Sequence, residues 1–103
     1  MYLELMPGEA PALRDAGNFR AFKLVVHGTP AMLEAARAAF AGLATFEDAA
    51  HAWVAAGALQ ARPEVAEDGA WQAGFAAMVE KARPHGWIHP ETGAIRAHVE
   101  WTA

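Results

Sequence analysis

Alanine is the residue that most limits what this chain can fold into. The sequence has 27 alanines among its 103 residues, so only 29 of its hydrophobic residues carry a larger apolar side chain. Alanine favours helices but removes little apolar surface from water, and burial stabilises by roughly 25 cal/mol per Å². The sequence therefore predicts closely packed helices around a small core. We expect a homo-oligomer, because a partner subunit would bury further apolar surface.

The length and the charge argue against several classes of protein. A chain of this length fits one domain, and we expect residues 1–103 to form it. The net charge is −4 and the eight lysines and arginines are scattered, so we expect no nucleic acid partner. No apolar run approaches the roughly 20 residues of a membrane span, which predicts no membrane partner and a cytoplasmic location. The absence of cysteine removes disulfides and thiolate chemistry.

Alternating apolar residues indicate an early strand over about residues 19–27. Leu24 would lie on one face of this strand, and Lys23 and His27 on the other, because successive side chains of a strand point to opposite faces. A shorter strand is expected over residues 2–6, before an irregular loop rich in proline and glycine.

Three helices are expected from capping residues and helical apolar spacing, over about residues 30–43, 45–59 and 68–83. We interpret Asp48 as part of the N-terminal cap of the second helix and Asp68 as the N-cap of the third. On this interpretation, His51 belongs to the second helix.

The C-terminal segment, about residues 86–101, is expected to form a β-hairpin that turns through Pro90–Gly93. A four-residue loop would place three pairs of residues opposite each other: His89 and Ala94, Trp87 and Arg96, and His85 and His98. The expected fold class is therefore α+β, with about three helices packed on a small antiparallel sheet that contains the early strand and this hairpin.

The hairpin register separates an apolar face from a polar one. The apolar face would hold Ile88, Ile95, Ala97, Val99 and Trp101. The polar face would hold His85, Trp87, His89, Arg96, His98 and Glu100, and the early strand could add Lys23 and His27. A solvent face of an antiparallel sheet normally carries polar residues, so this surface alone does not demonstrate a site.

Two hypotheses for function follow. The first is a small binding or assembly domain whose ligand pocket or interface would use Lys23, His27, His85, Trp87 and His51. The second is a cofactor-free enzyme acting on a small anionic or carbonyl substrate. In the enzyme, His98 would be the acid–base group, Glu100 would orient it, and Arg96 or Lys23 would hold an anion.

Several kinds of chemistry have no support in the sequence. The chain has no serine, no glycine-rich phosphate loop and no dinucleotide-binding motif, and we expect no cofactor. His85, His98 and Glu100 could together offer three metal ligands, but their spacing matches no established motif, and we expect no metal. Both hypotheses allow a small-molecule ligand.

Overall fold

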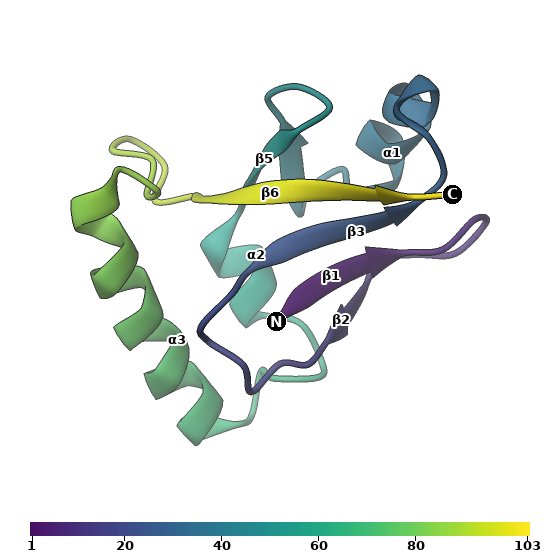
Figure 1. The fold of residues 1–103 in the computed structure, drawn as a ribbon. Helices are drawn as coiled ribbons and strands as arrows, with labels where there is room; N and C mark the ends of the chain where they lie inside the picture. The colour runs from purple at the N-terminus through teal and green to yellow at the C-terminus, as the bar shows by residue number, and fades with distance from the viewer.

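A mixed six-stranded sheet organises the computed structural model, which describes residues 1–103 (Figure 1). Along the chain the strands are β1 (Tyr2–Leu5), β2 (Ala12–Arg14), β3 (Lys23–His27), β4 (Ala44–Phe46), β5 (His51–Val54) and β6 (Ile95–Thr102). Their order across the sheet is β2-β1-β3-β6-β5-β4. The β3 strand runs parallel to both of its neighbours, whereas the other pairs are antiparallel. The α+β class is confirmed, but the expectation of a purely antiparallel sheet is wrong.

Three helices and two 3-10 turns complete the fold: η1 (Pro30–Met32), α1 (Leu33–Ala39), α2 (Ala56–Gln60), α3 (Gly69–Ala82) and η2 (Arg83–His85). Figure 1 shows α1 and α2 behind β1, β3 and β6, and α3 beside the end of the sheet where β6 begins. No helix lies in front of these three strands in this view. None of the helices has the length and apolar character that crossing a bilayer requires.

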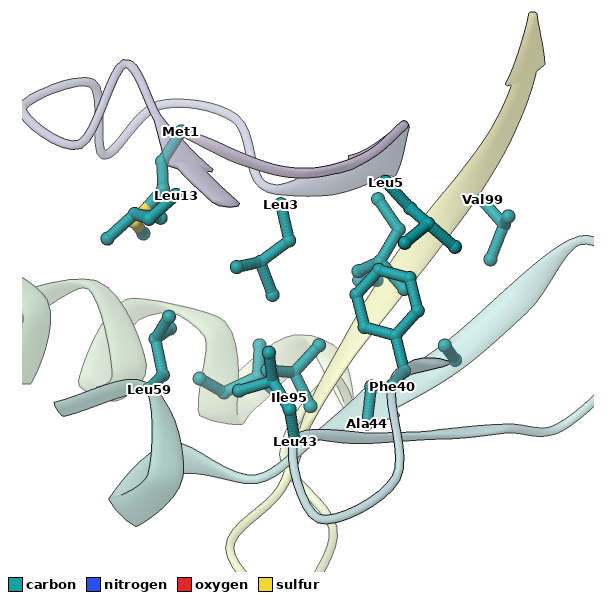
Figure 2. Packing of buried hydrophobic residues seen from close by; sticks show 14 of the residues in the cluster. Met1, Leu3, Leu5, Leu13, Phe40, Leu43, Ala44, Leu59, Ile95 and Val99 are labelled. Atoms are coloured by element: carbon teal, nitrogen blue, oxygen red, sulfur yellow. The ribbon is translucent and has the colours of Figure 1, made fainter. Parts of the chain in front are cut away.

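The core lies on one face of the sheet only. In β3 and β6 the buried residues alternate with exposed or half-buried ones, and 22 buried residues form one apolar cluster. Figure 2 shows Leu3, Leu5 and Phe40 among the side chains that meet in this cluster. The expected apolar face of β6 is confirmed, with Val99 buried and Trp101 half-buried.

The expected helix over residues 45–59 is wrong, because most of this segment forms the β4–β5 hairpin. The side chain of Asp48 accounts for the difference. Its Oδ1 accepts hydrogen bonds from the backbone N–H groups of Ala50 and His51, both at 2.8 Å, and so closes a turn instead of capping a helix. Beyond the turn, Ala52 and Val54 are fully buried between half-buried neighbours, which is the period of a strand. Only residues 56–60 are helical.

The other two expected helices are present, with different bounds. The first begins with a 3-10 turn and ends at Ala39, earlier than expected. The third has the expected N-cap, since the Asp68 side chain accepts a hydrogen bond from the Trp71 backbone N–H at 3.0 Å. Its apolar side faces the core through Trp71 and Phe75.

The C-terminal hairpin has the expected register but is shorter than expected. Ile88 and Ile95 form a single bridge, and the His89 N–H donates to Ala94 O at 2.8 Å. His85 lies in η2, so it does not pair with β6. Past the turn, β6 is instead paired with β5 on one side and β3 on the other.

Candidate functional site

A cavity of about 670 Å³ opens where the C-terminal end of α3, the loop before β3 and the β5–β6 pair meet. Its 14 lining residues come from five separate stretches of the chain. The polar ones are Arg20, His51, Lys81, His85, Arg96 and His98. The larger apolar ones are Phe19, Phe22, Met78, Trp87 and Ile95.

The strand register brings two histidines together on one wall. His51 on β5 lies directly opposite His98 on β6, and their rings meet edge to face with centroids 5.9 Å apart. Arg96 shares the exposed face of β6 with His98, and its guanidinium donates to Glu47 Oε2 at 3.0 Å. The cross-strand partner of His98 is therefore His51, and the expected pairing with His85 is wrong because His85 precedes the bridge.

The η2 turn places a second aromatic pair at the cavity. The rings of His85 and Trp87 are stacked, with centroids 4.6 Å apart and planes 22° from parallel. Gly86, between them, has a φ of 75°, a left-handed conformation that glycine adopts without strain. The backbone N–H of Arg96 donates to Trp87 O at 2.8 Å and fixes this turn to β6.

The opposite wall is the loop before β3, which packs against α3. The Phe19 ring lies so close to Gly74 that a Cβ added there would be 2.5 Å from Phe19 Cε2. The amino group of Met1 donates to Asn18 O at 2.8 Å and to Ala21 O at 3.0 Å. These contacts hold the loop in place at the mouth of the cavity.

The charge of the cavity is opposite to that of the chain. Three of the eight lysines and arginines line it together with three of the five histidines, whereas none of the twelve carboxylate side chains does. Arg96 is paired with Glu47, but Arg20 and Lys81 take part in no ion pair. Two unpaired cations facing one cavity form a local positive field.

Three of the residues singled out in the sequence lie outside this cavity. Lys23 Nζ donates to Glu100 Oε2 at 2.6 Å, and this bond holds the pKa of the Glu100 carboxyl below its ordinary value. No hydrogen bond joins Glu100 to His98, although the two share a face of β6. His27 pairs with Glu4 on β1, where the Nε2 to Oε2 distance is 2.9 Å.

One group of side chains has a geometry that could hold a cation. The ligand atoms of Glu47, Asp48 and His51 lie within 4.8 Å of one another. Both carboxylates already have partners, since Glu47 bonds Arg96 and Asp48 accepts from the hairpin backbone. The set of His85, His98 and Glu100 does not converge in this way.

Sequence reasoning found five of the residues that line the cavity and missed the unpaired cations. Arg20 falls within the expected strand over residues 19–27, but β3 begins only at Lys23, and Arg20 lies in the loop before it. Lys81 lies in the last turn of α3, and the expected polar sheet face includes neither residue. One sequence feature could have indicated Lys81 as a site residue: it lies four residues before His85, at the end of an apolar helix.

Comparisons with protein families, curated proteins and solved structures find no match to this chain.

Proposed function

We propose that this protein is a binding domain for a small organic anion, which it holds in the cavity between α3 and β6. The observation that carries the proposal is the charge of the lining: three permanent cations, of which Arg20 and Lys81 are unpaired, and three histidines, with no carboxylate among the lining residues, in a chain of net charge −4. Scattered surface charge would be expected to mix both signs. A cavity from which carboxylates are absent favours a ligand that carries negative charge.

The size of the cavity favours an organic molecule over an inorganic ion. A volume of about 670 Å³ lies within the range of sites that enclose metabolite-sized ligands, roughly 300–1,000 Å³. Phe19, Phe22 and Met78 would contact the apolar part of such a ligand, while Arg20 and Lys81 would pair with its charge. Desolvating these apolar walls supplies affinity, and the cations supply orientation.

The test compares acids with their uncharged amides. Isothermal titration calorimetry with 2-naphthoate and decahydro-2-naphthoate is expected to show tighter binding than with the matching amides. Lys81→Gln should weaken binding of the acids by about fivefold, the effect of one partly exposed ion pair, and leave the amides unchanged. Arg20→Gln should act in the same way, and raised salt should weaken the acids selectively.

Matched controls exist for both cations. Lys23, the only other lysine, is paired with Glu100 and lies outside the cavity, so Lys23→Gln should leave the affinity for the acids unchanged. Arg83 pairs with Glu80 close to the cavity without lining it, so Arg83→Gln controls for Arg20→Gln. Equal affinity for acids and amides, or no binding of either acid, would contradict the proposal.

Catalysis by a cofactor-free enzyme remains the second hypothesis from the sequence. Its acid–base pair would require Glu100 to orient His98, but the Glu100 carboxylate is bonded to Lys23 and lies outside the cavity, and no carboxylate lines the cavity. Binding without chemical conversion is therefore the simpler proposal. Homo-oligomerisation and a cytoplasmic location stay predictions from the sequence.

A further inference from the structure

We infer that the ligand of this cavity contains a planar aromatic ring and that the ring stacks on Trp87. This inference rests on the proposed function, since it names the class of anion that the same cavity would take. Trp87 lines the cavity with 50% of its surface exposed, more than any other large hydrophobic residue. Because this exposed indole lies on the cavity wall, its ring is accessible to a ligand in the cavity.

A neighbouring ring and two backbone hydrogen bonds restrict the orientation of the Trp87 ring. The His85 ring stacks against it at 4.6 Å, and the backbone of Trp87 is bonded to Arg96 N and, through its own N–H at 3.4 Å, to Ala82 O. The stack covers part of the indole from one side, and half of the side chain remains accessible. A ring that is already oriented loses little conformational entropy when a ligand stacks on it.

The indole N–H of Trp87 also lacks a partner. The N–H groups of Trp71 and Trp101 donate to backbone oxygens, those of Ala16 at 2.9 Å and Ala49 at 2.7 Å. Neither Trp53 nor Trp87 donates to a protein acceptor through Nε1, and of these two only Trp87 lines the cavity. Tryptophan side chains in binding sites commonly combine an apolar face with a polar edge, so Trp87 can both stack on a ligand ring and donate to a ligand oxygen.

The remaining lining fits the same ligand. Phe19 and Phe22 on the facing loop add aromatic surface, and Lys81 and Arg20 supply unpaired positive charge. A flat ring bearing a carboxylate would contact both kinds of surface at once. A saturated ring of the same size would keep the charge contact but lose the stacking, because it has no π face.

The experiment compares 2-naphthoate with decahydro-2-naphthoate, which have the same carbon skeleton and charge. Calorimetric titration of the full chain is expected to show 2-naphthoate binding about fivefold more tightly, as stacking contributes beyond apolar area. Trp87→Leu should abolish this preference while both acids still bind. Trp53→Leu is the matched control, since Trp53 lies on β5 outside the cavity and should leave the preference intact.

The outcomes separate the two proposals. Equal affinity of the wild-type chain for the two acids overturns the aromatic inference and leaves anion binding standing. No binding of either acid overturns both. Should Trp87→Leu fail to fold, as judged by circular dichroism, quenching of tryptophan fluorescence by 2-naphthoate in wild type and in Trp87→Phe provides the second measurement. If 2-naphthoate quenches the fluorescence of Trp87→Phe as strongly as that of wild type, the ligand ring does not contact Trp87.

Discussion

Glu4 is the residue whose ionisation is most plainly tied to the fold. Its carboxylate lies 2.9 Å from His27 Nε2 on β3 and accepts a hydrogen bond from Arg14 Nε on β2 at 3.3 Å. The hydrogen bond with His27, followed by the contact with Arg14, lowers the pKa of the Glu4 carboxyl from its ordinary value. One side chain of β1 therefore links both of its neighbouring strands.

The lowered pKa of Glu4 predicts how stability depends on pH. A carboxyl whose pKa is lower in the folded state stabilises fully above its unfolded pKa of about 4.3, and this stabilisation is lost as the pH falls through the folded value. We expect Glu4→Gln to lower the thermal unfolding temperature by a few degrees at about pH 7 and by much less at about pH 3. Circular dichroism melts at both pH values measure the difference.

The control for this substitution is Glu9→Gln. Glu9 is exposed and forms no ion pair, so its substitution should leave the unfolding temperature unchanged at both pH values. A Glu4→Gln deficit that stays constant from neutral to acidic pH would mean that the side chain acts through packing and not through its charge.

At the scale of single residues, the sequence predicted which side chains share a surface better than it predicted which of them bond to one another. It indicated that His98, Glu100, Lys23 and Arg96 share a polar surface, and all four do lie on the uncovered face of the sheet. It could not predict that Glu100 bonds Lys23 in preference to His98, because that choice depends on the parallel pairing of β3 with β6. Parallel neighbours are joined through long connections, which leave little local signal.

At the scale of elements, two glycines in helices have opposite surroundings. Gly57 in α2 has no atom within 4 Å of the position where a Cβ would lie, whereas a Cβ on Gly74 in α3 would be 2.5 Å from the Phe19 ring. Glycine in a helix interior is about 1 kcal/mol less favourable than alanine. The same substitution should therefore have opposite effects at the two positions.

We expect Gly57→Ala to raise the free energy of unfolding by about 0.5–1 kcal/mol through helix propensity alone. Gly74→Ala should lower it by about 1 kcal/mol, because overpacking that displaces Phe19 costs more than the propensity gains. Urea denaturation measures both. Stabilisation by Gly74→Ala would show that the Phe19 ring moves freely, and that the loop does not form a fixed wall of the cavity.

The elements that the sequence predicted well carry large side chains, and the one it mistook is rich in alanine. Trp71 and Phe75 mark the buried stripe of α3 directly. In residues 49–58, alanines occupy strand, turn and helix alike, so helix propensity outweighed the alternation of Ala52 and Val54 with their half-buried neighbours. Because His51 was assigned to a helix, its position opposite His98 could not be predicted.

For the whole molecule, the chain exposes about as much surface as a folded monomer of its mass, yet its core is small. The accessible surface of 5801 Å² is close to the roughly 5,600 Å² expected for a monomer of 11.0 kDa. Six of the 23 buried residues are nevertheless alanine, and these contribute little apolar area: Ala36, Ala44, Ala52, Ala82, Ala94 and Ala97. A chain with such a core gains comparatively little from burial within one subunit.

The homo-oligomer expected from this small core predicts that stability depends on protein concentration. Association that requires folded subunits stabilises them by mass action, so dilution from about 100 μM to about 1 μM should lower the unfolding temperature by several degrees. Scanning fluorimetry follows the shift, and sedimentation equilibrium over the same range gives the mass of the assembly. An unfolding temperature independent of concentration, together with a mass near 11.0 kDa throughout, would contradict the expectation. In that case the apolar cluster of one subunit suffices to hold the cavity between α3 and β6 in shape.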